Sequence, residues 1–222
     1  MNCELYNNNN DKLVLFFNGF GMDINPLRIL LNSNLTILHI NKYYDLNFEE
    51  IKNISKNFSN KIILSYSLGV YFAGLFLLEN LLKFKEVIAI NGTLEPINNN
   101  YGIDPKMFDL TIKLFDEKGR QNFYRNMFYE MNDYQKFLEN QPNRMCDEQK
   151  NELITIKKII SDKNLKINRD LFTKIFVSKY DKIIPTKSQI NFWEKVEFIE
   201  TGHFPFYSFD IVNVLEVGFN NG

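Results

Sequence analysis

The sequence predicts an α/β protein with a mostly parallel sheet, helices on both faces of that sheet, and a helical insertion. Short apolar runs and longer helical stretches alternate between residues 13 and 92, which is typical of a parallel sheet covered by helices. A second observation is a serine at a sharp turn between an apolar strand and a helix, within residues 61–82. A third is that the alternation stops after residue 93 and resumes near Thr173.

Seven elements are expected in the first part of the chain. The strands are predicted near 13–17, 35–40, 61–65 and 86–91, and the helices near 24–32, 48–58 and 68–82. The first of these strands is continuously apolar, as expected of a strand buried on both faces. Four asparagines at 7–10 are expected to form a hairpin loop between a short first strand and the strand at Leu13.

No strand is expected from about Pro105 to Ile160, where apolar side chains recur at helical spacing. We interpret this segment as a cap over the edge of the sheet where the strands end. The expected division is a core of residues 1–94 and 171–222 and a helical cap of residues 95–170. Most aromatic side chains of the cap are expected to pack between helices, and a minority to line an apolar pocket.

The serine at the turn lies in the motif Ser65-Tyr66-Ser67-Leu68-Gly69. A serine between a strand and a helix, with small residues two positions away on each side, has the form of the nucleophile elbow of α/β-hydrolases. Small neighbours are needed because the strand and the helix crowd each other at the turn. Ser65 stands where the usual pattern has glycine. The motif therefore predicts an α/β-hydrolase fold with Ser67 as nucleophile.

Two later loops supply the partners that a serine nucleophile needs. Asp181 and His203 each follow a predicted apolar strand, and the chain order Ser, Asp, His is the order that this fold uses. The only other histidine, His39, lies inside a predicted strand, where a packing role is expected. The predicted triad is therefore Ser67, Asp181 and His203. Glu95 also follows a strand and is the alternative acid.

Backbone N–H groups are expected to bind the oxyanion. In α/β-hydrolases one donor is the residue after the nucleophile, and the other lies in the loop after an earlier strand. The glycine-rich loop at 18–23 follows such a strand. The expected donors are therefore Phe20 and Leu68.

Composition narrows the class of protein. The chain has 222 residues, 45% of them hydrophobic, which suffices for one substantial core. Its formal net charge of -1 gives no overall attraction to nucleic acid or to an anionic membrane. Cys3 and Cys146 form no ligand spacing, and the N-terminus lacks the segments of a signal peptide. The longest apolar run, at 70–78, is too short to cross a bilayer. A cytoplasmic protein is expected.

Several segments resemble the BioG-type pimeloyl-carrier-protein methyl ester esterases. They lie at residues 17–23, 65–71, 89–97, 101–108 and 123–127, so the likeness spans nearly the whole chain. The resemblance implies an α/β-hydrolase of biotin synthesis that removes the methyl group from the methyl ester of pimeloyl attached to acyl carrier protein. It carries the family triad onto Ser67, Asp181 and His203. The chemistry then needs no metal or organic cofactor.

The resemblance also implies acyl carrier protein as the partner. Carrier proteins are acidic as a family, whereas the net charge of this chain gives no overall attraction. A local basic patch on the cap is therefore expected, with four candidates: Lys106, Arg120, Arg125 and Arg144. Two alternatives stay open, a general short-acyl esterase or thioesterase and a non-catalytic binding protein with a hydrolase fold.

Overall fold

A seven-stranded sheet in the order β1-β3-β2-β4-β5-β6-β7 runs through the molecule. The computed structural model describes residues 1–80, 82–163 and 168–220. Neighbouring strands are parallel except for β1 and β3, which pair antiparallel. This architecture confirms the predicted fold class. The strands are β1 (Asn2–Tyr6), β2 (Lys12–Phe17), β3 (Thr36–Asn41), β4 (Asn60–Tyr66), β5 (Glu86–Ile90), β6 (Lys174–Ser178) and β7 (Glu197–Ile199).

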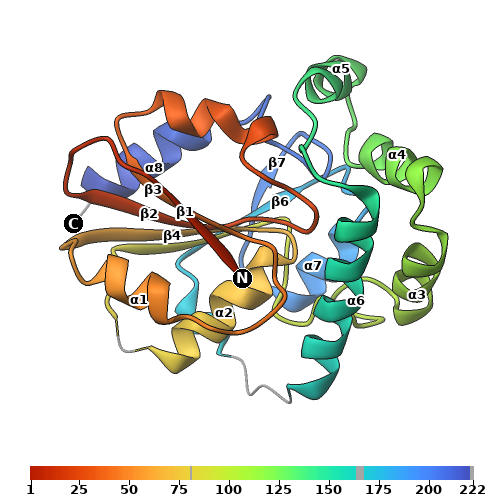
Figure 1. Cartoon of the computed structure of the whole chain (residues 1–222), viewed down its shortest axis with the longest axis horizontal. Helices are drawn as coiled ribbons and strands as arrows, with labels where there is room; N and C mark the ends of the chain where they lie inside the picture. The colour runs from red at the N-terminus through yellow and green to blue at the C-terminus, as the bar shows by residue number, and fades with distance from the viewer. Residues whose placement is uncertain (81, 164–167, 221–222) are drawn as a thin grey trace.

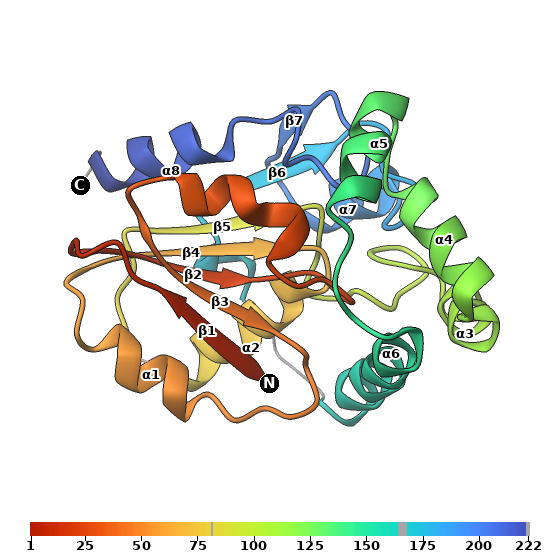
Figure 2. The ribbon, with the colours of Figure 1, turned by 45° about the horizontal axis from the view of Figure 1, so that its top comes forward.

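Helices cover both faces of the sheet (Figures 1 and 2). The 3-10 helix η1 (Asn25–Asn32) and α8 (Ile211–Asn220) lie on one face, and α1 (Glu49–Ser55), α2 (Gly69–Glu79) and α7 (Thr186–Phe192) on the other. Strand β2 contributes alternate side chains to the two apolar layers and is buried on both faces, as its sequence predicts. Within the described ranges, no helix has the length and apolar character needed to cross a membrane.

The prediction of a hairpin at the N-terminus is wrong. Strand β1 pairs with β3, with Tyr6 opposite Ile37, and does not pair with β2. Strand β2 already has a parallel neighbour on each side, so it has no free edge for β1. The asparagine loop crosses over to β3 instead, where the side-chain amide of Asn8 donates to the carbonyls of Ser33 and Leu35 at 2.9 and 2.8 Å.

The described residues between β5 and β6 form helices joined by loops, as expected. The helices are α3 (Pro105–Leu114), α4 (Glu117–Asn126), α5 (Met131–Glu139), α6 (Cys146–Asp162) and the short 3-10 turn η2 (Arg169–Leu171). Asp104 and Asp116 accept hydrogen bonds from the first N–H groups of α3 and α4, so both helices begin at side-chain caps. The four α-helices lie beyond the edge toward which the β4 and β6 arrows point in Figure 2. We propose that residues 95–170 act as a cap on the core formed by 1–94 and 171–222.

Helix α2 begins in very close contact with β2. A Cβ atom built on Gly69 would lie 2.2 Å from the carbonyl oxygen of Phe17 and 2.5 Å from that of Asn18. Both are backbone atoms of the sheet and its first loop, so neither moves without displacing the strand end. On the same helix, a Cβ at Gly74 would meet only the end of the Leu94 side chain, at 2.5 Å. The close approach at Gly69 therefore fixes where α2 starts.

We expect Gly69→Ala to lower the free energy of unfolding by more than about 3 kcal/mol, because the new methyl group collides with backbone that has nowhere to move. Gly74→Ala is the matched control. We expect it to cost less than about 2 kcal/mol, since Leu94 can change rotamer and alanine favours the helix. Chemical denaturation of both variants measures the difference. Equal costs would contradict this account of the α2 start.

Candidate active site

Ser67 lies directly between β4 and α2 in a strained backbone conformation. Its φ of 55° is in the left-handed region that residues other than glycine rarely adopt. The Ser67 N–H donates to the carbonyl of Ile90 at 2.9 Å, and its carbonyl accepts from the N–H of Val70 at 3.1 Å. Ser65, where the motif departs from glycine, is buried and donates its hydroxyl to the carbonyl of Ile88 at 2.7 Å. The departure is thus accommodated by a hydrogen bond to β5.

Three buried side chains form a hydrogen-bonded chain that begins at Ser67. The Ser67 Oγ lies 2.8 Å from Nε2 of His203, and the His203 Nδ1 lies 2.8 Å from Oδ2 of Asp181. A carboxylate only accepts, so Nδ1 carries the proton and Nε2 is free to accept from the serine hydroxyl. This arrangement can transfer a proton from Ser67 to His203 as the serine attacks a carbonyl carbon.

Asp181 is held in place by groups other than the histidine. Its Oδ1 accepts from the N–H groups of Ile183 and Ile184 at 2.8 and 3.0 Å. Its Oδ2 also accepts from the side-chain amide of Gln189 at 2.9 Å. These donors fix the carboxylate in one orientation toward His203. The alternative acid, Glu95, accepts instead from the side-chain amide of Asn98 at 2.7 Å.

Asn91 connects the end of β6, just before the loop of Asp181, to the loop that carries His203. It follows β5 with a φ of 50°, and its side-chain amide donates to the carbonyl of His203 and to Oγ of Ser178, both at 2.7 Å. Its side-chain oxygen accepts from the Ser178 N–H at 2.7 Å. Asn91 was not among the site residues predicted from the sequence. An asparagine at a strand end was a usable signal, because asparagine tolerates positive φ better than most residues.

His39 has the packing role expected of it. It is fully buried in β3, with its Nε2 2.8 Å from the amide of Asn18 and its Nδ1 3.1 Å from the amide of Asn41. Its ring also lies against Phe16, with centroids 5.8 Å apart. Both ring nitrogens are thus occupied away from Ser67.

Two backbone N–H groups beside Ser67 are free to bind an oxyanion. In the described part of the chain, the N–H groups of Phe20 and Leu68 have no hydrogen-bond acceptor. The neighbouring N–H groups of Gly19 and Gly21 are both bonded to side chains. Leu68 is also the first residue before α2, where the helix dipole favours negative charge.

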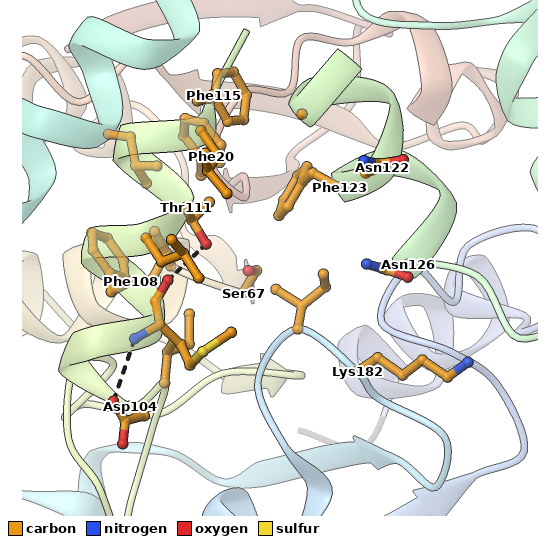
Figure 3. A pocket seen from close by; sticks show the side chains of 18 of the residues that line it. Phe20, Ser67, Asp104, Phe108, Thr111, Phe115, Asn122, Phe123, Asn126 and Lys182 are labelled. Carbon is orange, nitrogen blue, oxygen red and sulfur yellow. Dashed lines mark hydrogen bonds between the residues drawn. The ribbon is translucent and has the colours of Figure 1, made fainter. Parts of the chain in front are cut away.

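Ser67 opens onto a cavity of about 530 Å³ that is lined mainly by apolar side chains (Figure 3). Two of its polar residues, Asp104 and Thr111, bond within α3: Asp104 caps the helix and Thr111 donates to the carbonyl of Met107. The apolar lining comprises Phe20, Leu68, Ile103, Met107, Phe108, Leu110, Leu114, Phe115, Phe123, Leu153, Ile183 and Pro185. Such a cavity suits an aliphatic chain.

Three unpaired polar side chains lie together on one side of this cavity. Figure 3 shows Asn122, Asn126 and Lys182 on the side opposite Phe108 and Asp104. Within the described residues none of the three has a side-chain hydrogen bond or an ion pair. Asn122 and Asn126 are exposed and lie one helical turn apart on α4. This polar side is available to a ligand.

The basic residues predicted to bind a partner differ in whether their charge is already bonded within the protein. Lys106 is exposed and makes no ion pair with the rest of the described chain. Arg120 pairs with Glu117 and donates to the carbonyl of Arg144. Arg125 donates to the carbonyl of Phe128, and its guanidinium lies over the ring of a nearby tyrosine.

Arg144 requires a correction. Its side chain is only 1% exposed, and it is paired with Glu152 at 2.6 Å and with Glu148 at 3.2 Å. Burial works against the charged form, yet the two carboxylates raise the pKa of Arg144 above its usual value. Arg144 is therefore an interior cation and does not contribute to a basic surface.

Comparison with known proteins gives one family match over almost the whole chain. A family model described as "Pimeloyl-ACP methyl esterase BioG" matches residues 1–215. The chain is also 32% identical over 182 residues to a malonyl-[acyl-carrier protein] O-methyltransferase of Bacteroides fragilis. That match covers 82% of this chain and 36% of the relative, so the chain spans about a third of the relative's length.

Solved structures are similar over nearly the full length. The crystal structure of BioG from Haemophilus influenzae has a TM-score of 0.86 and 25% identity, covering 97% of this chain and 99% of that one. An esterase from Exiguobacterium antarcticum has a TM-score of 0.69 and 15% identity, covering 97% and 92%. The second likeness concerns the fold alone.

The two candidate acids can be separated by isosteric substitution. We expect Asp181→Asn to lower hydrolysis of a p-nitrophenyl ester by about four orders of magnitude, because an amide donor forces the proton of His203 onto Nε2. Glu95→Gln is the matched control and should change the rate by less than about threefold, because among the described residues Glu95 bonds only within its own loop. A large loss in Glu95→Gln with little in Asp181→Asn would reverse the assignment.

Proposed function

The chain belongs to the BioG family of pimeloyl-ACP methyl esterases, and we propose that it hydrolyses the methyl ester of pimeloyl-[acyl-carrier protein]. The products are pimeloyl-[acyl-carrier protein] and methanol, and the reaction serves biotin synthesis. The observation that carries the proposal is the hydrogen-bonded chain from Ser67 through His203 to Asp181, which opens onto an apolar cavity. The family supports a hydrolase, and the serine mechanism is our proposal.

The proposed reaction has two halves. His203 takes the proton of Ser67 as its oxygen attacks the ester carbonyl, and the N–H groups of Phe20 and Leu68 bind the resulting oxyanion. The tetrahedral intermediate collapses, methanol leaves with the proton from His203, and the acyl group remains on Ser67. Water, activated by His203, then releases the free carboxylate. Losing one oxyanion donor of this kind costs about 3–4 kcal/mol of transition-state stabilisation.

The cavity supports a substrate whose apolar chain continues into polar groups. The carbons of a pimeloyl chain match the apolar lining beside Ser67. On the carrier side of the chain come a thioester and then the amides of the pantetheine arm. Asn122 and Asn126 can each donate to and accept from such groups, and Lys182 supplies a cation at the same side. A small free ester has no use for these three side chains.

The malonyl-[acyl-carrier protein] O-methyltransferase relative also supports a carrier-linked methyl ester. O-methylation of a malonyl carboxylate on a carrier makes a methyl ester of the type that the proposed reaction removes. The partner is then an acidic acyl carrier protein. Lys106 and Lys182, both exposed and unpaired within the described residues, are candidates for its attraction. The two free cysteines are in keeping with a cytoplasmic location.

A second candidate is a general short-acyl esterase or thioesterase that uses the same residues on free small molecules. The hydrogen-bonded Ser67 and His203 disfavour the third possibility, a non-catalytic binding protein. Carrier-linked and free esters tell the first two candidates apart.

Ser67→Ala tests the nucleophile. We expect the folded variant to lose several orders of magnitude in turnover of pimeloyl-carrier methyl ester, because the serine, histidine and acid act as a unit. Mass spectrometry of the carrier follows the loss of the methyl group. A fluorophosphonate probe should label the wild-type protein and fail to label the variant. Near-normal hydrolysis by folded Ser67→Ala would contradict the proposal.

The polar side of the cavity can be tested with a double variant. We expect Asn122→Leu with Asn126→Leu to raise the KM for a pantetheine-linked methyl pimeloyl ester about tenfold, because two amide hydrogen bonds are lost. The KM for dimethyl pimelate should stay within about twofold. Asn132→Leu, on the exposed surface of α5, controls for the added apolar surface. Equal losses on both esters would count against recognition of the pantetheine arm.

A further inference from the structure

The N–H of Phe20 belongs to a loop that is fixed on its N-terminal side. The carbonyl of Asn18 accepts a hydrogen bond from the hydroxyl of Tyr43 at 2.7 Å. The next N–H, that of Gly19, donates to the side-chain oxygen of Asn18 at 2.7 Å. The peptide unit before the one that carries the Phe20 N–H is therefore bonded at both its oxygen and its nitrogen.

The C-terminal side of the loop is held by helix α6. The N–H of Gly21 donates to Oε2 of Glu152 at 3.3 Å, and the carbonyl of Gly21 accepts from the side-chain amide of Gln149 at 2.7 Å. Gly21 has a φ of +72° and lies in a turn that is closed by a hydrogen bond from the Met22 N–H to the Gly19 carbonyl at 3.4 Å. The free N–H of Phe20 thus lies between two anchored segments, and the second anchor comes from the helical insertion.

Glu152 contacts the groups that hold the loop on both sides of Phe20. Its side chain is fully buried, and its Oε1 accepts from the N–H of Tyr43 at 3.1 Å, the residue whose hydroxyl holds Asn18. The Tyr43 ring stacks on Phe72 of α2, with centroids 3.9 Å apart. One carboxylate therefore connects the loop, the residue behind the loop and, through stacking, the helix that follows the nucleophile.

The charge of Glu152 is balanced inside the protein. Arg144 donates to its Oε2 at 2.6 Å. Burial raises the pKa of the Glu152 carboxyl, and Arg144 together with the N–H groups of Tyr43 and Gly21 opposes that rise. The neighbouring Glu148 pairs with Arg144 at 3.2 Å and with Lys42 at 2.9 Å, and it makes no bond to the loop within the described residues. Of these two carboxylates, only Glu152 acts on the loop.

We propose that Glu152 is a positioning residue that sets the direction of the Phe20 N–H and so shapes the oxyanion site from the helical insertion. The adjacent Leu153 lines the substrate cavity. Helix α6 therefore forms part of the cavity wall and also fixes an oxyanion donor. The inference rests on the proposed function, because it assigns the oxyanion role to Phe20.

Glu152→Gln and the matched control Glu148→Gln separate positioning from general stabilisation. Each variant takes one carboxylate partner away from Arg144. Only Glu152→Gln also changes the group that accepts the hydrogen bond from the Gly21 N–H. The readouts are kcat and KM on dimethyl pimelate, and Ki for a trifluoromethyl ketone that forms a tetrahedral oxyanion on the serine. We expect Glu152→Gln to lower kcat about 10- to 100-fold, to leave KM within about threefold, and to raise Ki by the same factor as kcat/KM falls. Glu148→Gln should leave all three within about twofold.

A double variant keeps the test decisive if Glu152→Gln does not fold. Arg144→Met with Glu152→Met replaces the buried ion pair by apolar side chains of similar size, an exchange that proteins often tolerate. It should fold and show the same joint change in kcat and Ki. An unchanged Ki in a folded variant, or an equal change in Glu148→Gln, would overturn the role of Glu152. If wild-type protein neither hydrolyses the ester nor binds the ketone, the proposed function fails as well.

Discussion

The left-handed backbone at Ser67 is the constraint on which the site depends. A residue other than glycine at a φ of 55° costs about 1–3 kcal/mol and persists only where its surroundings fix it. Here the Ser67 N–H bonds to the end of β5, and α2 starts so close to β2 that only glycine fits at position 69. A Cβ at Gly92 would likewise lie 2.3 Å from the Ser67 carbonyl. Strain at the serine is thus balanced by packing around it, and the hydroxyl is held toward His203.

The chemistry is assembled at one edge of the sheet by several separate loops. Loops after β4, β6 and β7 supply the proposed serine, acid and histidine, and Asn91 after β5 bonds to the last residue of β6 and to the histidine loop. The proposed cap adds the apolar walls from α3 and α4 and, through α6, a contact to the loop that carries Phe20. N–H groups that are already fixed toward the developing charge stabilise it without having to reorganise during the reaction. Core and cap therefore form the proposed site together.

Local patterns predicted the parts of this structure that depend on neighbours in sequence. Apolar runs located β2 to β5, and the motif around Ser67 located the turn, because burial and turn geometry act over a few residues. The partner of β1 was not predictable in this way, since it depends on which strand edge is free. The same holds for Arg144, whose surface or interior position is decided by two carboxylates on α6. Asn91 and Glu152 act across 87 and 131 residues of sequence. The strand end could have indicated the backbone turn at Asn91, whereas no local pattern identifies the bonding partners of either side chain.

The most direct test of the account is to follow heavy oxygen from labelled water during hydrolysis of pimeloyl-carrier methyl ester. An acyl-enzyme on Ser67 that water resolves places the heavy oxygen in the pimeloyl carboxylate, on a carrier that is lighter by one methylene and otherwise intact. The methanol released should contain none. Heavy oxygen in the methanol would contradict attack at the ester carbonyl. Release of free carrier with the methyl ester retained would show a thioesterase instead.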